Sequence, residues 1–197
     1  DGFVGSVARG GVVNFTNVYF NPHGHGTHTE CLGHITKEAE SVNRIQLPLL
    51  IPCLLHTISP ANIQGDSVIT IEHLPGGGFT DEKLPKALII RTLPNESDKT
   101  SKDWANTNPT YLHSDFTDKL VERGVEHLIV DLPSVDKEID GGTLLSHRAF
   151  FRVPEAPRTE ATITEFVFIP NEVEDGLYAL NLQLAPFDLD ASPSRPV

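Results

Sequence analysis

The sequence predicts a mixed α/β fold, and the observations that predict it lie between residues 87 and 131. Residues 87–92 form a nearly continuous apolar run, which is typical of a strand buried on both faces of a sheet. Residues 114–124 carry apolar side chains at helical spacing and end on a glycine, which favours a helix with a glycine after its C-terminus. Residues 125–131 form a second apolar run that ends on a carboxylate. A strand, a helix and a strand in this order indicate a βαβ-like unit.

Two stretches near the N-terminus also favour strands. Residues 3–7 and 12–20 are rich in β-branched and aromatic residues, and Gly10-Gly11 between them indicates a turn. The second stretch leads directly into a histidine-rich segment, residues 21–34, whose last part, residues 28–34, favours a short helix. The sequence therefore predicts that the histidine-rich segment begins at the end of a strand.

The rest of the chain is expected to alternate short elements with turns. A strand is expected at residues 68–71, a turn at Pro75-Gly76-Gly77-Gly78, and a long polar surface excursion at residues 94–108. Further along the chain we expect a polar turn at 131–136, a short helix at 142–150, a strand at 161–169, a closing strand at 176–184 and a tail rich in proline and aspartate at 188–196.

Composition limits the classes of function. The 197 residues fit a single domain, residues 1–197. The formal net charge of −12 argues against nucleic acid and anionic membranes as partners, since both attract a positive protein surface. No apolar run approaches the roughly 18 residues that span a bilayer. The chain begins at Asp1 and contains no methionine, so we expect an N-terminal segment to be missing. Two cysteines are too few for a disulfide framework, which favours a reducing compartment such as the cytoplasm.

The histidine-rich segment has the composition of a metal-binding loop. Four of the nine histidines fall within residues 21–34, together with three glycines and Glu30. Imidazole nitrogens and carboxylate oxygens are common ligands of zinc and similar ions, and glycines let a loop bend so that such side chains converge. His28 and Glu30 are two residues apart, so on an extended backbone their side chains point the same way. The alternative is a polar surface loop that happens to carry four histidines.

Several motifs, taken together, identify a family resemblance. The first is His23-x-x-Gly26-Thr27-His28-x-Glu30-x-x-x-His34, and it is followed in order by Asp131–Asp136, Leu145–Arg148, Ile163–Glu165, Ala179–Leu184 and Asp190–Arg195. These segments resemble the cyclase family of metal-dependent hydrolases (kynurenine formamidase-like), whose pattern is His-x-Gly-Thr-His-x-Asp with a histidine four residues later. The resemblance covers nearly the whole chain and implies a swivelling β/β/α-type fold.

The resemblance also implies the roles of particular residues. His28 and Glu30 correspond to metal ligands, and His147 and Glu165 would complete the coordination of a second ion, with Glu30 bridging the two. His34 corresponds to the catalytic histidine of the family.

Two positions leave an alternative open. The first histidine of the motif corresponds to His23 if one residue is inserted, which keeps the following motif in phase, and His25 is the alternative. Glu160 competes with Glu165 for the second ion, and the strand context favours Glu165. Glu30 itself departs from the family pattern, because it replaces an aspartate and lengthens the side chain by one methylene.

Other candidate groups are weaker. Asp131 and Asp136 are possible ligands, but the hydrogen bonding of a turn explains them equally well. Cys31 has no evident activating partner, so we expect a buried thiol. His127 lies within an apolar strand pattern, which favours packing.

These residues favour a metal-dependent hydrolase that acts on an amide-type C–N bond of a small molecule, as an arylformamidase does. One or two divalent ions are expected, zinc or manganese, to activate water as the nucleophile and polarise a carbonyl, while His34 shuttles a proton. The resemblance implies a homodimer or larger assembly. The alternatives are a catalytically inactive member of the same fold that binds a metal or ligand, and a lyase or cyclase that uses the same metal site.

Overall fold

An eight-stranded mixed sheet forms the centre of the fold in a computed structural model that describes residues 2–76 and 83–197. Four neighbouring strands run parallel: β8 (Thr162–Glu165), β7 (His127–Val130), β5 (Ala87–Thr92) and β2 (Ile51–Ile58). Antiparallel strands extend the sheet beyond β8 and beyond β2: β1 (His28–Glu30), β11 (Ala191–Pro196) and β10 (Leu182–Leu184) on the first side, and β9 (Gly176–Leu180) on the second.

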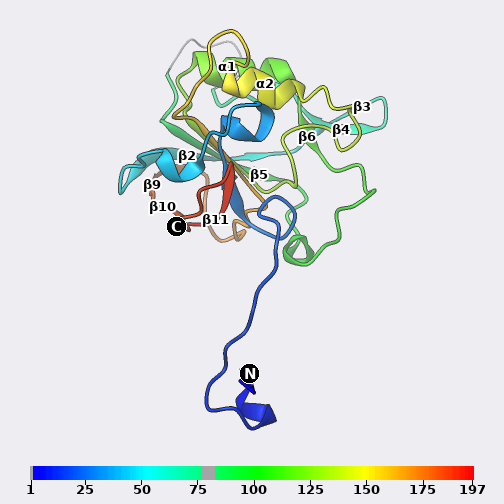
Figure 1. Cartoon of the computed structure of the whole chain (residues 1–197). Coiled ribbons are helices and arrows are strands. Elements are labelled where there is room, and N and C mark those ends of the chain that lie inside the picture. The colour runs from blue at the N-terminus through cyan, green and yellow to red at the C-terminus, as the bar shows by residue number, and fades with distance from the viewer. Residues whose placement is uncertain (1, 77–82) are drawn as a thin grey trace.

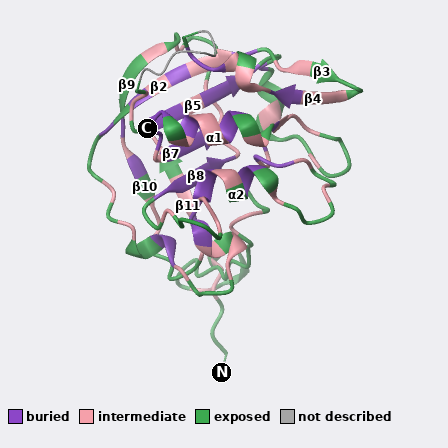
Figure 2. Cartoon of the chain, turned by 90° about the horizontal axis from the view of Figure 1, so that it is seen from above, coloured by how far each residue is buried: buried purple, intermediate pink, exposed green. Residues whose placement is uncertain are grey.

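Two helices cover one face of this sheet. The helices α1 (Ser114–Glu122) and α2 (Leu145–Phe151) lie side by side over the central strands, as Figure 1 and Figure 2 show. A separate three-stranded sheet contains β3 (Ala61–Ile63), β4 (Asp66–Ile69) and β6 (Tyr111–Leu112). The 3-10 helices are η1 (Val7–Arg9), η2 (Leu32–Ile35), η3 (Val42–Arg44), η4 (Ile71–His73) and η5 (Ser97–Thr100). Within the described ranges, no helix has the length and apolar character needed to cross a membrane.

The main core lies between the helices and the sheet. Phe116 of α1 and Phe150 and Phe151 of α2 are fully buried there. Alternate residues of β5 and β7 face this layer, and the residues between them face a smaller apolar cluster on the opposite side of the sheet. Both faces of these strands are covered, which is why residues 87–92 read as one apolar run. The predicted mixed α/β class is confirmed.

Most elements predicted after residue 87 are present. The helix expected at 114–124 is α1, and Gly124 follows it with a φ of +90°, which glycine adopts without strain. The expected helix around His147 is α2, and the expected strand around Glu165 is β8. The closing strand is divided into β9 and β10, because the backbone N–H of Asn181 bonds to Val197 instead of continuing the pairing with β2.

The strands predicted at residues 3–7 and 12–20 are wrong. This part of the chain extends away from the sheets (Figure 1), and Val12 and Tyr19 are 90% and 91% exposed. A β-favouring run becomes a strand only where a neighbouring strand pairs with its backbone, and no described strand pairs with this one. The short helix η1 forms instead and ends at the predicted turn, Gly10.

The chain around the histidine-rich segment also differs from expectation. Residues 28–30 form the strand β1, and helical structure begins only at Leu32. The proline-rich tail is an ordered strand, β11, that pairs with β1. Pro193 does not interrupt this pairing, because the backbone hydrogen bonds on either side of it use other residues. The carbonyl oxygen of Asp190 accepts one of them and the N–H of Ser194 donates the other.

Three further expectations concern the middle of the chain. The strand predicted at residues 68–71 ends at Ile69, because Thr70 caps the short helix η4. In the turn predicted at 75–78, Gly77 and Gly78 lie outside the described residues. The polar residues 94–108 lie mostly at the surface, as expected.

His127 packs inside the fold, as expected for a residue of a buried strand. Its Nδ1 lies 2.9 Å from Thr162 Oγ1, and burial lowers its pKa to about 4. In an unfolded chain the pKa of histidine is about 6.5, so between pH 6.5 and 4 the unfolded state binds more protons than the folded state. The stability that neutral His127 contributes is therefore complete above pH 6.5 and is lost as the pH falls towards 4.

We expect His127→Gln to flatten the pH dependence of the free energy of unfolding. The difference between wild type and variant should change by on the order of 3 kcal/mol between about pH 7.5 and pH 4, because glutamine does not titrate. Urea unfolding of both proteins at the two pH values measures this change. Parallel pH profiles for the two proteins would contradict the buried neutral state of His127.

Candidate metal centre

Strands β1 and β8 place three of the predicted ligands on one face of the sheet. His28 lies directly opposite Glu165 in the antiparallel pairing, and Glu30 is two residues further along β1. Residues two apart in a strand share a face, as do residues directly opposite each other on neighbouring strands. Helix α2 lies over this face and supplies His147.

Glu30 is at the centre of the group. Its side chain is fully buried. Its Oε1 lies 2.8 Å from His147 Nε2, and its Oε2 lies 3.2 Å from His23 Nδ1 and 3.9 Å from His34 Nε2. Oε2 has no hydrogen-bond partner, although it is inaccessible to solvent. The longer glutamate side chain therefore still reaches imidazoles on both sides of it.

His28 presents a second unpaired atom. Its Nδ1 lies 3.0 Å from the carbonyl oxygen of Gly26, which favours the tautomer with the proton on Nδ1. Its Nε2 is then an acceptor, and this buried atom has no hydrogen-bond partner and lies 3.4 Å from Glu165 Oε2. Against burial, Glu165 raises the pKa of His28, so this nitrogen can bind an ion once it has lost its proton.

His147 is oriented by Asp136. Its Nδ1 lies 2.6 Å from Asp136 Oδ2, while the same carboxylate accepts the backbone N–H groups of Ser146 and His147. The Nε2 of His147 is therefore directed at Glu30 and lies 4.0 Å from Glu165 Oε1. A carboxylate behind a histidine is a common arrangement around metal ligands, because it fixes the tautomer and the ring orientation. Asp136 has this outer position.

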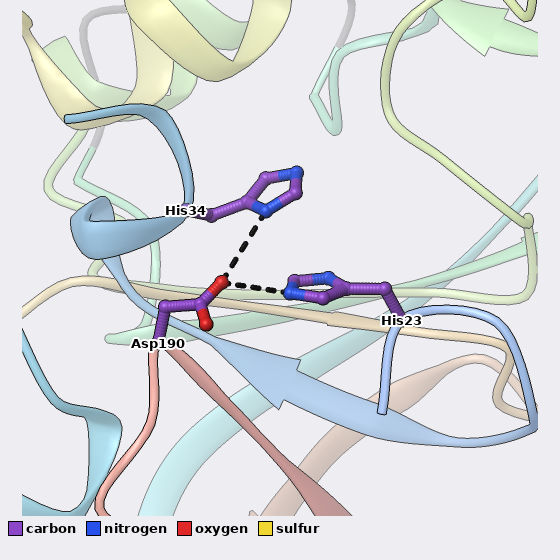
Figure 3. Close-up of side chains that lie close together, drawn as sticks. All are labelled: His23, His34 and Asp190. Atoms are coloured by element: carbon purple, nitrogen blue, oxygen red, sulfur yellow. Dashed lines mark hydrogen bonds and ion pairs between the residues drawn. The ribbon is translucent and has the colours of Figure 1, made fainter. Parts of the chain in front are cut away.

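The histidine-rich loop and the C-terminal strand close the remaining side of the group. His23 stacks on His34 with ring centroids 4.2 Å apart. Asp190 Oδ2 lies 2.8 Å from His23 Nε2 and 3.4 Å from His34 Nδ1. Figure 3 shows the Asp190 carboxylate in contact with both rings. The side chains of His23 and His34 are 27% and 31% exposed, so this is the side of the group that solvent and small molecules reach.

The structure brings His23, and not His25, to this group. His25 is exposed, and its Nδ1 accepts the backbone N–H of Asn21 at 3.0 Å within the loop. Glu165 faces the group, whereas Glu160 is exposed in the turn before β8. In both cases the residue preferred from the sequence is the one near Glu30.

Charges in the metal-free centre hold protons on the imidazoles. Burial alone would raise the pKa of Glu30, but His147 and then His23 lower it. Burial alone would lower the pKa of His147, but Glu30 and the hydrogen bond to Asp136 raise it well above its usual value. Against burial, the nearby carboxylates of Glu30 and then Asp190 raise the pKa of His23 to about 9. A metal ion must therefore compete with protons for these imidazoles.

The donor atoms fit divalent ions. His23, His28 and Glu30 offer three ligand atoms within 4.8 Å of one another, and so do Glu30, His34 and His147. Glu30 belongs to both sets. Buried polar atoms are normally paired, and the unpaired His28 Nε2 and Glu30 Oε2 would both be satisfied by a cation between them. Imidazole nitrogens with carboxylate oxygens suit zinc, manganese and neighbouring first-row ions.

The weaker candidates lie outside the centre. Asp131 accepts hydrogen bonds from the backbone and hydroxyl of Thr92 and from Lys99 Nζ, at 2.8 to 2.9 Å, which accounts for its burial. Cys31 is buried next to the centre, and burial raises the pKa of its thiol to about 11, so it is not a nucleophile at neutral pH.

Sequence reasoning did not assign Asp190 a role and left Asp136 undecided between ligand and turn. The sequence offered a local signal for Asp136, because it lies only eleven residues before His147, and a turn between them can bring the two side chains together. Asp190 begins the last segment of the family resemblance, but nothing in the local sequence connects it to the histidines, which it reaches through the pairing of β11 with β1.

The chain matches one family and several related proteins. Residues 6–137 match the family model Cyclase, described as "Putative cyclase". The chain is 26% identical over 187 residues to the kynurenine formamidase of Bordetella petrii, and the match covers 94% of this chain and 80% of that protein.

Similar solved structures share the fold. The structure of a potential metal-dependent hydrolase with cyclase activity superimposes with a TM-score of 0.69 at 17% identity, over 91% of this chain and 80% of that one. Isatin hydrolase A from Labrenzia aggregata, bound to benzyl benzoate, gives a TM-score of 0.64 at 14% identity, over 95% and 77% of the two chains. The fold expected from the sequence motifs is therefore confirmed.

The choice between His23 and His25 predicts different metal affinities for two variants. We expect His23→Ala to weaken Zn²⁺ affinity by at least about tenfold, because it removes the ligand nitrogen of His23 that faces Glu30. We expect His25→Ala to leave the affinity unchanged. Competition with a chromophoric chelator measures both affinities. Weaker binding in His25→Ala, with normal binding in His23→Ala, would reverse the choice.

Proposed function

Since the chain belongs to the cyclase family, we propose that it is a metal-dependent hydrolase that cleaves an amide-type C–N bond in a small molecule. The observation that carries this proposal is the buried Glu30 carboxylate, which lies between imidazoles on two sides and keeps one oxygen unpaired. A core of apolar or simply hydrogen-bonded side chains would stabilise the fold better than a buried charged cluster, so stability does not explain this group of donors. It is suited to hold a divalent ion.

Five residues hold one or two ions in this proposal: His23, His28, Glu30, His147 and Glu165. Glu30 would contribute to the donor sets of both ions, because its two carboxylate oxygens face different imidazoles. When bound, a divalent ion supplies Lewis acidity that polarises a carbonyl group and activates water. Asp136 and the carbonyl of Gly26 keep the His147 and His28 rings turned towards the centre.

His34 carries the proton in this proposal. Its Nε2 points at Glu30 from 3.9 Å, a distance too long for a hydrogen bond, so this nitrogen is available to a substrate. Its side chain is partly exposed, so it can also exchange a proton with solvent. A histidine at this position can donate a proton to the nitrogen that leaves when the C–N bond breaks.

The comparisons support a substrate with an amide-type bond. The relative from Bordetella petrii is named as a kynurenine formamidase, and one of the structural neighbours is an isatin hydrolase. An aryl formamide or an aryl lactam is therefore the substrate class that we propose for this chain.

Three finer points belong to the same proposal. Zinc or manganese is the ion, because the donors are imidazole nitrogens and carboxylate oxygens. The assembly is a homodimer or larger, which is supported by exposed apolar side chains between residues 12 and 20. The compartment is the cytoplasm, which is supported by two cysteines that are free and buried.

The proposal predicts metal-dependent turnover that requires His34. Protein purified without chelators should contain a divalent ion and hydrolyse an aryl formamide, and chelation should abolish both. His34→Ala should lower kcat by about 10²- to 10⁴-fold with bound metal retained, because proton transfer is lost. His25→Ala is the matched control and should keep full activity.

Two results would overturn this proposal. One is protein that binds no divalent ion, measured by inductively coupled plasma spectrometry. The other is His34→Ala protein with the wild-type kcat, which would remove the proton carrier from the mechanism. Product analysis by mass spectrometry separates hydrolysis, which adds one water, from a lyase or cyclase reaction.

A further inference from the structure

We propose that Asp190 is a shared positioning residue, whose single carboxylate oxygen orients both the ligand His23 and the proton carrier His34. This inference rests on the proposed function and extends it to a residue from the opposite end of the chain. The three side chains meet at one point, as Figure 3 shows, with Asp190 Oδ2 at 2.8 Å from His23 Nε2 and at 3.4 Å from His34 Nδ1.

The main chain fixes the place of Asp190. Ala191 pairs with Glu30 at the start of β11, and the backbone N–H of Cys31 donates to Asp190 O at 3.0 Å. On the other side, the N–H of Val42 donates to Leu189 O at 2.9 Å. The Asp190 carboxylate is thus held beside the centre by backbone pairing on both flanks, unlike a surface side chain that meets a histidine by chance.

Asp190 completes a pattern that the other imidazoles already show. His28 has the carbonyl of Gly26 behind its Nδ1, and His147 has Asp136 behind its Nδ1. Each of these acceptors leaves the opposite ring nitrogen facing the centre. Asp190 does the same for His23, whose Nε2 it binds and whose Nδ1 faces Glu30.

His34 depends on Asp190 more than the ligands depend on their acceptors. Its Nε2 is 3.9 Å from Glu30 and its Nδ1 is 3.4 Å from Asp190, so Asp190 is the nearer of these two carboxylates. The second restraint on the ring is stacking on His23, with the planes 29° apart, and His23 is itself held by Asp190. Removing this carboxylate therefore releases His34 directly and through His23.

A role for Asp190 as a ligand is less consistent with the geometry. His23, His34 and Asp190 do form a group with donor atoms within 4.8 Å. However, the atoms left without partners are His28 Nε2 and Glu30 Oε2, which lie on the buried side, whereas the Asp190 side chain is 36% exposed and its Oδ2 already binds His23. An ion between the unpaired atoms leaves Asp190 outside its coordination shell.

The test compares Asp190→Asn with Asp188→Asn, the matched control. Asp188 carries the same charge two residues earlier, and its side chain is 71% exposed with Arg44 at 3.8 Å. We expect Asp190→Asn to weaken Zn²⁺ affinity by about 10- to 100-fold through His23, as is usual for residues behind a metal ligand. At saturating Zn²⁺, its kcat for an aryl formamide should fall by at least about tenfold with KM unchanged. Asp188→Asn should behave like the wild type in both measurements.

A double-mutant cycle with His34→Ala separates positioning from general damage. If Asp190 acts on kcat through His34, then Asp190→Asn has no further effect on kcat once His34 is alanine. An equal loss of kcat in both backgrounds would overturn the proposal. So would the loss of a whole equivalent of bound Zn²⁺, which would make Asp190 a ligand, and so would an Asp190→Asn protein that matches Asp188→Asn.

The metal measurement needs no substrate. If wild-type protein does not hydrolyse the aryl formamide, the proposed function fails, while the effect of Asp190→Asn on Zn²⁺ affinity still decides whether Asp190 positions His23. If the wild type is active and Asp190→Asn has normal Zn²⁺ affinity, only the part of the proposal that concerns His23 would be overturned.

Discussion

The burial of the Glu30 carboxylate is the constraint around which the surrounding segments are arranged. A carboxylate removed from water loses several kcal/mol of hydration free energy, which nearby charges and donors must replace. His147 on α2 and His23 in the loop provide part of this replacement, at 2.8 and 3.2 Å. Oε2, which lies near His23 but has no hydrogen-bond partner, is where a cation is most strongly favoured. One buried charge thus connects a strand, a helix and a loop that are distant in sequence.

The same constraint explains the arrangement of the outer residues. Imidazoles that face a buried carboxylate tend to take up protons, as the raised pKa values of His147 and His23 indicate. Acceptors on the far side of each ring determine which nitrogen faces inwards. Asp136 has this position behind His147, and Asp190 has it behind His23. The centre therefore has an outer shell of hydrogen-bond acceptors behind the imidazoles and an inner set of potential metal-ligand atoms.

Patterns in the sequence predicted the elements whose stability is local or whose burial is complete. Residues 87–92 and 114–124 are of this kind, because both faces of β5 are covered and α1 has its own glycine terminus. The strands expected before residue 21 failed because side-chain preference cannot supply a partner strand. The opposite error was made after residue 188, where the prolines and aspartates indicated a tail. The structure has a strand there, β11, which pairs with a neighbouring strand on each side.

The candidate site divides along the same line. His28 and Glu30 could be paired from their spacing, because two residues along an extended chain share a face. His147 and Glu165 came only from the family resemblance, since no spacing rule connects residues more than a hundred positions apart. Asp190 required the register of β11 against β1, and register depends on packing across the whole sheet.

The shortness of β1 has a consequence for how the protein is made. Three residues cannot hold a strand in place alone, and β1 is fixed by β8 on one side and by β11 on the other. During synthesis the histidine loop therefore leaves the ribosome long before the segments that give it shape. An ion that binds only the completed centre stabilises the folded state and not the unfolded chain. The stabilisation is about 4 kcal/mol when the free ion concentration is a thousand times its Kd. Metal supply in the cell would then act on the yield of folded protein as well as on its chemistry.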